Sequence, residues 1–462
     1  MMKQANIYAG ALSDFIERED QYVDFKYSIG GIPVYGVIRR YVRELFCQSV
    51  GVGKTNDPIR DKKKYLLNII RSLFQLLAVL LKKKKYRYFI YSFYRTERVG
   101  DKYIDKFTDP LIENSNIKKD FIIFEHHRDG YHRNPRIHSE KVVYTDIIEV
   151  IGVVLCKIRI RALLRKYKED FVYLWKMLDS LMGDVEYDKE KIQFLFFRVM
   201  VRVRIYEFIF RRLGVKKMIA PARPVFLDLL YAAKKNNIKV YEVQHGILSA
   251  PGISYSGIID ESYTPDFFLS YGKIDSPELY GIPADRCINI GWALPNYMNS
   301  INPIICVDKQ KDVLVVLNPF TSRETIEIIL HLAETNISSN FYIRPHPTEA
   351  IPMDLMDKIE EKKNVIIQDN LIVFSYILSL FTMVMGDNSS ALNEAFSECK
   401  KVGRLSYPGF SPLYLNKEEE MKTWKIYDDL SFKAYLDAEP FGEIKTNVYS
   451  PYNRELVDEL FD

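Results

Sequence analysis

Two motifs in the second half of the chain decide the fold: F-Y-I-R-P-H-P-T-E at Phe341–Glu349 and M-G-D-N-S-S-A-L-N-E-A at Met385–Ala395. Each motif is typical of a buried strand, then a polar turn, then a helix. Strands that alternate with helices build a parallel sheet whose strands all end at one edge. Because α/β proteins bind ligands at that edge, we expect the two turns to form one site.

The second turn has the residues of an anion site. Gly386 allows a sharp exit from the strand, and Asp387, Asn388 and Ser389 are all good helix N-cap residues. The helix N-terminus would add free backbone N–H groups to the hydroxyls of Ser389 and Ser390. We therefore expect a phosphate at this turn.

The first turn supplies cationic or hydrogen-bonding side chains. Pro345 and Pro347 hold His346 in an extended conformation directly after Arg344. We expect Arg344 and His346 to reach toward the same phosphate.

The rest of the chain repeats the strand–helix alternation in two blocks, which predicts an α/β fold with two Rossmann-like domains whose parallel sheets face an interdomain cleft. A linker with several Pro and Asn residues separates the blocks. The expected units are an N-terminal acceptor domain at 1–295 with a helical insertion at about 142–213, a nucleotide-donor domain at 304–410, and a tail at 411–462 that packs back on the first domain.

The predicted strands are Arg87–Phe93, Asp120–Phe124, Lys216–Ala220, Ile238–Val243, Asp266–Tyr271, Cys287–Gly291, Asp312–Leu317, Phe341–Arg344, Asn364–Gln368, Phe381–Met385 and Lys401–Leu405. Thr321 and Glu324 have the spacing of a capping box, which predicts where a helix begins.

The composition excludes several classes of function. A net charge of +4 gives no indication of nucleic-acid binding, and the five cysteines form no C-x-x-C pair. No D-x-D triplet occurs, so we expect neither a metal ion nor another cofactor. The chain has no recognisable leader peptide and should remain in the cytoplasm.

Two further patterns could indicate a ligand site. His126, His127, His132 and His138 fall in one loop, but their spacing fits no compact metal-ligand set and the arginines between them would repel a cation. The string G-V-G-K-T at Gly51–Thr55 lacks the glycine that a phosphate-binding loop requires three residues before it.

The segment Tyr65–Lys85 is apolar and is flanked by lysines on both sides. One interpretation is a basic amphipathic helix on an anionic membrane surface, which would make the protein peripheral to the inner face of the cell membrane. The other is a core helix whose lysines are merely solvated. The sequence leaves both open.

In the first block, a strand ends at Gln244-His245-Gly246. If the two domains face each other, this turn lies opposite the phosphate site, on the acceptor side. His245 could then act as the general base on an acceptor hydroxyl. A histidine at a strand end is also often only structural, so this role is a hypothesis.

The motifs Q-H-G, R-P-H-P and G-D-N-S-S-A-L-N-E-A, in this order, resemble bacterial surface-polysaccharide glycosyltransferases of GT-B fold. The likeness is strongest to capsule and lipopolysaccharide enzymes that use CMP-activated acidic sugars such as Kdo or sialic acid. It implies that His346, Ser389 and Ser390 bind the CMP phosphate and that Glu394 contacts the ribose. The chain lacks the acidic base motif of bacterial sialyltransferases, so the base and the stereochemical outcome stay open.

The resemblance leaves other functions open. CDP-glycerol polymerases of teichoic acid are similar in the same places, and their H-G histidine matches His245. A sugar-nucleotide epimerase of this fold would bind UDP and need no acceptor, and a non-catalytic subunit would bind a nucleotide within a polysaccharide assembly complex. For the transferases the expected partners are a nucleotide-activated sugar and a glycan or glycolipid acceptor.

Overall fold

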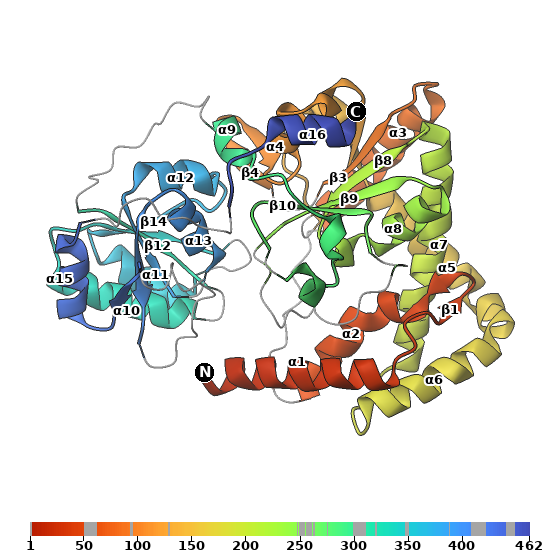
Figure 1. The fold of residues 1–462 in the computed structure, drawn as a ribbon, viewed down its shortest axis with the longest axis horizontal. Helices are drawn as coiled ribbons and strands as arrows, with labels where there is room; N and C mark the ends of the chain where they lie inside the picture. Colours follow the sequence, from red (N-terminus) through yellow and green to blue (C-terminus); the bar gives the residue numbers. More distant parts are fainter. Residues whose placement is uncertain are drawn as a thin grey trace.

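In the computed structural model, the chain folds around two separate parallel sheets, which lie in two domains (Figure 1). The structure describes residues 2–49, 62–92, 96–127, 130–246, 248, 255, 261, 264–274, 276–298, 311–318, 321–346, 351–387, 389–407, 422–439 and 449–462. The expectations for Asn388 and Pro347, and for most of the linker, lie outside these residues.

The first sheet has seven parallel strands in the order β11-β10-β9-β8-β3-β6-β7. Apolar residues alternate between its faces: Phe89 and Tyr91 of β3 enter one core cluster, while Tyr88 and Ile90 enter the other. Both faces are therefore covered. The strands are β3 (Tyr88–Ser92), β6 (Phe121–Glu125), β7 (Val142–Tyr144), β8 (Lys217–Pro221), β9 (Lys239–Val243), β10 (Phe267–Ser270) and β11 (Cys287–Asn289).

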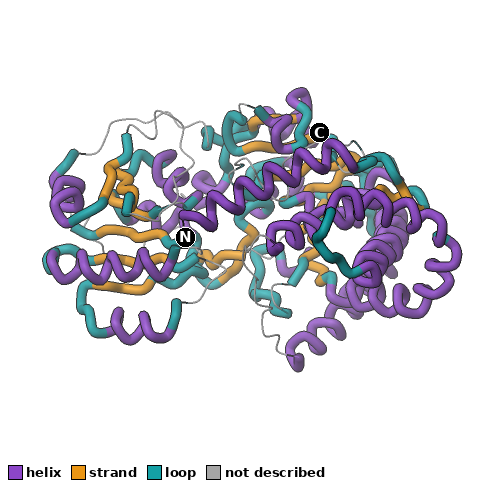
Figure 2. Tube along the Cα trace, turned by 90° about the horizontal axis from the view of Figure 1, so that it is seen from below, coloured by secondary structure: helices purple, strands orange, loops and turns teal. Residues whose placement is uncertain are grey.

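Helices cover the first sheet. They are α1 (Met2–Tyr22), α2 (Val34–Ser49), α3 (Lys62–Leu81), α4 (Asp109–Glu113), α5 (Asp146–Lys166), α6 (Lys168–Met182), α7 (Lys189–Leu213), α8 (Leu227–Lys235) and α9 (Leu294–Met298). The expected helical insertion is α5–α7, which lies on the side away from the second domain (Figures 1 and 2). It begins later than residue 142, because V-V-Y at Val142–Tyr144 pairs with β6 as an edge strand. Two hairpins complete the domain, β1 (Ser28–Ile29) with β2 (Ile32–Pro33) and β4 (Thr96–Val99) with β5 (Lys102–Asp105).

The second sheet has six parallel strands in the order β14-β13-β12-β15-β16-β17. The strands are β12 (Val313–Val316), β13 (Phe341–Arg344), β14 (Val365–Ile367), β15 (Met383–Gly386), β16 (Lys401–Leu405) and β17 (Trp424–Ile426). The helices are α10 (Ser322–Thr335), α11 (Met353–Glu360), α12 (Phe374–Leu380), α13 (Ser390–Ser397) and α15 (Asp429–Asp437). The α/β class with two parallel sheets is thus confirmed.

The tail is divided between the domains. Strand β17 and α15 extend the second sheet beyond residue 410. The last helix, α16 (Arg454–Phe461), lies on the first domain, where Val457 and Phe461 join its core cluster (Figure 1). The chain therefore ends on the domain in which it began.

Candidate functional site

The register of the second sheet brings the two motif turns to one edge. Val316 of β12 pairs with Arg344 of β13 on one side and with Gly386 of β15 on the other. Since adjacent strands lie about 4.8 Å apart, the two outer backbones are separated by about 10 Å at this level. Both turns therefore leave the same edge of the sheet, on either side of the end of β12.

Two helices begin at this edge. Ser389 is the N-cap of α13, and its Oγ accepts a 3.4 Å hydrogen bond from the Ala391 N–H, while Ser390 is exposed in the first turn. On the other side of the β12 terminus, α10 begins at Ser322. The positive ends of two helix dipoles thus flank the end of β12, which favours a bound anion.

The turn after β12 belongs to the same site, and the sequence did not single it out. Thr321 is the N-cap of α10, so the predicted start of this helix is confirmed, but the expected capping box is wrong because the Thr321 side chain makes no cap hydrogen bond. Its hydroxyl donates instead to Asp387 Oδ2 at 2.6 Å. This short bond to a buried carboxylate fixes the direction in which the hydroxyl points. The one signal for Thr321 in the sequence was its place shortly after the predicted strand Asp312–Leu317.

Arg344 is buried and holds the neighbouring loop. Its guanidinium donates to the backbone oxygens of Asp369, Asn370 at 3.0 Å and Ile372 at 2.6 Å. Burial lowers the pKa of this guanidinium. Arg344 therefore holds the loop of residues 369–372 against the end of β13. His346, two residues further on, is half-buried and lies beyond the end of the strand.

Glu394 lies at the contact between the domains. Its carboxylate is buried on α13 and accepts a 2.7 Å hydrogen bond from the Ser375 hydroxyl. Burial raises the pKa of Glu394, and the positive charge of Lys106 in the first domain acts against that rise. Burial raises the pKa of Tyr271, which directly follows β10, well above its usual value, and the charges of Tyr449, Asp105 and, least of all, Glu394 add to that rise. Glu394 is thus within electrostatic range of groups in the first domain.

The hairpin β4–β5 forms the bridge between the domains. The Phe374 N–H donates to Glu97 Oε2 at 3.2 Å, and Lys106 Nζ lies 3.1 Å from the other carboxylate oxygen of Glu97. The backbone of Arg98 pairs with Ile372 as a parallel bridge. The hairpin therefore fixes Lys106 between the two sheets.

His245 is the second residue after β9 on the first domain and is half-buried. Its Nδ1 lies 3.3 Å from the Tyr255 hydroxyl, which donates to Glu242 Oε1 at 2.6 Å. Because the tyrosine proton goes to Glu242, the tyrosine oxygen is left to accept from Nδ1–H. That tautomer places a basic lone pair on Nε2, as a general base requires. Burial raises the pKa of Glu242.

Gln244 and Gly246 shape the turn around His245. The buried Gln244 amide donates to the Gly246 carbonyl at 2.9 Å and accepts from the Tyr271 N–H at 2.8 Å. Gln244 thereby ties the end of β9 to the end of β10. A side chain at position 246 would meet no atom within 4 Å among the described residues, so this turn has room beside it.

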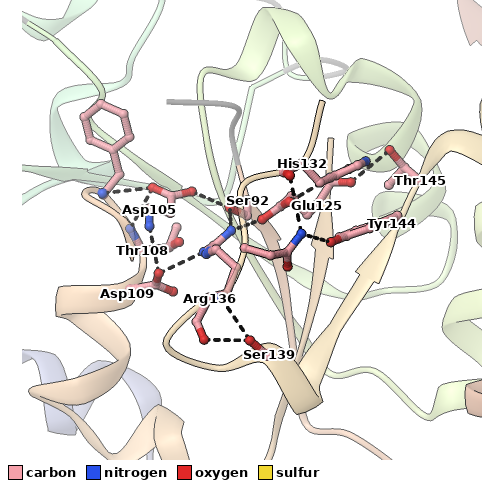
Figure 3. A network of polar contacts seen from close by, with 12 residues as sticks. Ser92, Asp105, Thr108, Asp109, Glu125, His132, Arg136, Ser139, Tyr144 and Thr145 are labelled. Atoms are coloured by element: carbon pink, nitrogen blue, oxygen red, sulfur yellow. Dashed lines mark hydrogen bonds and ion pairs between the residues drawn. The ribbon is translucent and has the colours of Figure 1, made fainter. Parts of the chain in front are cut away.

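The histidine-rich loop folds into a buried ionic network (Figure 3). The two ring nitrogens of His132 face Glu125 at 2.7 Å and Asp146 at 2.8 Å. Arg136 pairs with the other oxygen of Glu125 and with Asp109 at 2.8 Å. These side chains form ion pairs with one another inside the first domain. The sequence could not predict the network, because its carboxylates come from three separate elements, β6, α4 and α5.

His126, His127 and Glu149 bring their ligand atoms within 4.8 Å of one another. Spacing within the loop did not predict this group, because Glu149 lies on α5. The Gly130 N–H donates to His127 Nδ1 at 3.1 Å, so in the neutral ring the proton is on Nε2, which faces Glu149 at 3.5 Å. Although burial raises the pKa of Glu149, the two neighbouring histidines hold it well below its usual value. His126 Nδ1 and His127 Nε2 lie 2.6 Å and 3.5 Å from the carboxylate oxygens of Glu149.

No protein-family model matches the chain, and no curated protein matches it. Solved structures similar to it include the UDP-GlcNAc 2-epimerase from Methanocaldococcus jannaschii, at 12% identity and a TM-score of 0.46, covering 81% of this chain and 98% of that one. The wall teichoic acid polymerase TagF is similar at 12% identity and a TM-score of 0.42, covering 86% and 88%. The calicheamicin glycosyltransferase CalG4 is similar at 9% identity and a TM-score of 0.41, covering 76% and 89%.

Proposed function

We propose that the protein is a glycosyltransferase that moves an acidic sugar, of the Kdo or sialic acid kind, from a CMP-activated donor to a surface glycan or a lipid-linked acceptor. The observation that carries the proposal is the register of Val316 with both Arg344 and Gly386, because it puts both motif turns at one sheet edge. The residue types in these turns are those that hold a phosphate.

The second domain would hold the donor. The N-termini of α10 and α13, the hydroxyls of Ser389 and Ser390, and the imidazole of His346 would bind the CMP phosphate. Glu394 is proposed to contact the ribose, and Asn388 is proposed to bind the donor. The same donors would stabilise the negative charge that grows on the phosphate as the bond to the sugar breaks, without requiring a metal ion.

The first domain would hold the acceptor. His245 would take the proton from the acceptor hydroxyl as that oxygen attacks the anomeric carbon, while CMP leaves with the electrons of the broken C–O bond. The tautomer that Tyr255 favours supports this role, since it leaves Nε2 as the basic nitrogen.

The test is donor selectivity. The pure protein is incubated with CMP-Kdo, CMP-sialic acid, CDP-glycerol and UDP-sugars, and nucleotide binding and release are measured. The proposal expects cytidine nucleotides to bind more tightly than uridine nucleotides and a CMP-sugar to turn over. A preference for UDP would contradict it, and turnover of CDP-glycerol alone would assign a polyol-phosphate transferase instead.

A further inference from the structure

Helix α3 exposes a large apolar face. Among the described residues, the segment Lys63–Leu81 is the one helix long and apolar enough to cross a membrane, with a mean hydropathy of 1.5. Phe74 is 66% and Leu81 77% exposed. Further exposed large apolar side chains on this helix are Leu66, Leu67, Ile70, Leu73 and Leu77. The interpretation of this segment as a core helix is therefore wrong.

The polar residues of α3 face the protein. Asn68 donates to the Gly130 carbonyl at 2.7 Å, Ser72 accepts from the Ile147 N–H at 2.9 Å, and Gln75 accepts from the Tyr144 N–H at 3.0 Å. Positions 68, 72 and 75 follow the spacing of one helix face. The same face also carries apolar residues that pack on the core of the first domain, namely Ile69, Leu76, Val79 and Leu80. The exposed apolar side chains therefore form a second apolar face, which the domain does not cover.

The charge around this face has one sign. Residues 62–85 contain eight Lys or Arg and no Asp or Glu. Lys82, Lys83, Lys84 and Lys85 are all exposed directly after the helix. An apolar face bordered by lysines matches the acyl chains and phosphates of an anionic bilayer surface.

We propose that α3 docks the protein on an anionic lipid bilayer, with its apolar face in the lipid interface. The helix lies on the membrane and does not cross it. Crossing would break the hydrogen bonds of Asn68, Ser72 and Gln75 to the domain and would expose these side chains to hydrocarbon.

The docked face would place the acceptor side of the enzyme near the lipid, an inference that rests on the proposed function. The Tyr65 ring lies 5.4 Å from that of His127, the second residue after β6. Gly130, in the loop after β6, and Tyr144, the last residue of β7, lie at the same carboxyl edge of the first sheet and bond to α3. An acceptor that is linked to a membrane lipid could then reach this edge without leaving the bilayer.

Co-sedimentation with vesicles tests the docking itself and needs no activity. Vesicles of phosphatidylcholine alone are compared with vesicles containing phosphatidylglycerol, at low and high salt. We expect binding only to the anionic vesicles, weakened by salt. The variant with Leu67→Glu and Phe74→Glu should bind at least tenfold more weakly. Lys82→Gln should weaken binding by about fivefold at low salt.

The control is Ile337→Glu, which changes a side chain that is 83% exposed on the second domain and should bind vesicles like the wild type. Equal binding by the Leu67/Phe74 variant, or no binding by the wild type at low salt, would overturn the proposal. The proposal would also be overturned if the protein were a dimer that the Leu67/Phe74 changes dissociate and that vesicles do not. The apolar face of α3 would then join two copies of the chain. Loss of vesicle binding with unchanged nucleotide binding leaves the proposed function intact.

Discussion

Thr321 donates a 2.6 Å hydrogen bond to Asp387, which ties the turn after β12 to the turn after β15. The bond is buried, and it joins the start of α10 to the residues that precede the N-cap of α13. The relative position of the two helix N-termini therefore depends on it.

Replacing Thr321 by valine keeps the shape and removes the donor. We expect Thr321→Val to lower the free energy of unfolding by about 1–2 kcal/mol and to weaken binding of CMP, because the carboxylate of Asp387 loses a partner. Chemical denaturation and calorimetric titration measure the two effects. The matched control is Thr325→Val on the same helix, whose buried hydroxyl has no hydrogen-bond partner within the described part of the chain. Equal effects of both changes would contradict the role of the Thr321–Asp387 bond.

His245 is expected to act on the chemical step. His245→Ala should lower kcat by about 10²–10⁴-fold, the usual contribution of a general base, and leave the Kd of the donor unchanged. Tyr255→Phe should cause a smaller loss, because it removes the oxygen that orients the ring and keeps the imidazole. Steady-state kinetics with a saturating acceptor check both variants. A His245→Ala enzyme with normal kcat would exclude this histidine as the base.

Glu398, at the end of α13, should make stability depend on pH. Burial, and next the charge of Glu394, raise the pKa of Glu398 from 4.5 to about 7. A carboxyl group whose pKa rises on folding stabilises the folded state at low pH, and that contribution is lost as the pH rises through about 7. Glu398→Gln should thus increase the free energy of unfolding at pH 8 by on the order of 1 kcal/mol, with little change at pH 5. Exposed Glu140→Gln is the control. If Glu398→Gln and Glu140→Gln had the same free energy of unfolding at pH 8, the raised pKa of Glu398 would be refuted.

Gly291 lies where the C-terminal tail of the chain contacts the first domain. Its φ is +75°, and a Cβ there would lie 2.1 Å from the Pro451 carbonyl oxygen. Gly31, with a φ of +74°, has open space at the same place. Both alanine variants should lose about 1 kcal/mol from the strained backbone, and Gly291→Ala should lose clearly more because the tail must move. Denaturant unfolding compares them, and equal losses would mean that the tail contact contributes little.

The sequence predicted most strands of both sheets, because they are short apolar runs bounded by turn residues. It could not predict their order, and so it did not show that the turn with Thr321 lies between the two motif turns. The sequence predicts that Arg344 binds a phosphate, yet its guanidinium is buried among backbone acceptors that lie far away in the sequence. Only the three-dimensional contacts distinguish a buried cation that holds the fold from one that binds a ligand. The same holds for α3, because its composition fits a core helix and a membrane helix equally well.

The central claim, that the carboxyl edge of the second sheet holds a nucleotide phosphate, is tested most directly by titrating CMP into three proteins in a calorimeter. These are the wild type, His346→Ala and the control His331→Ala, which changes an exposed histidine on α10. We expect His346→Ala to weaken CMP binding by about tenfold or more, the cost of one charge-assisted contact to phosphate, and His331→Ala to bind CMP like the wild type. Identical affinity in all three proteins, or no binding of CMP by the wild type, would contradict it.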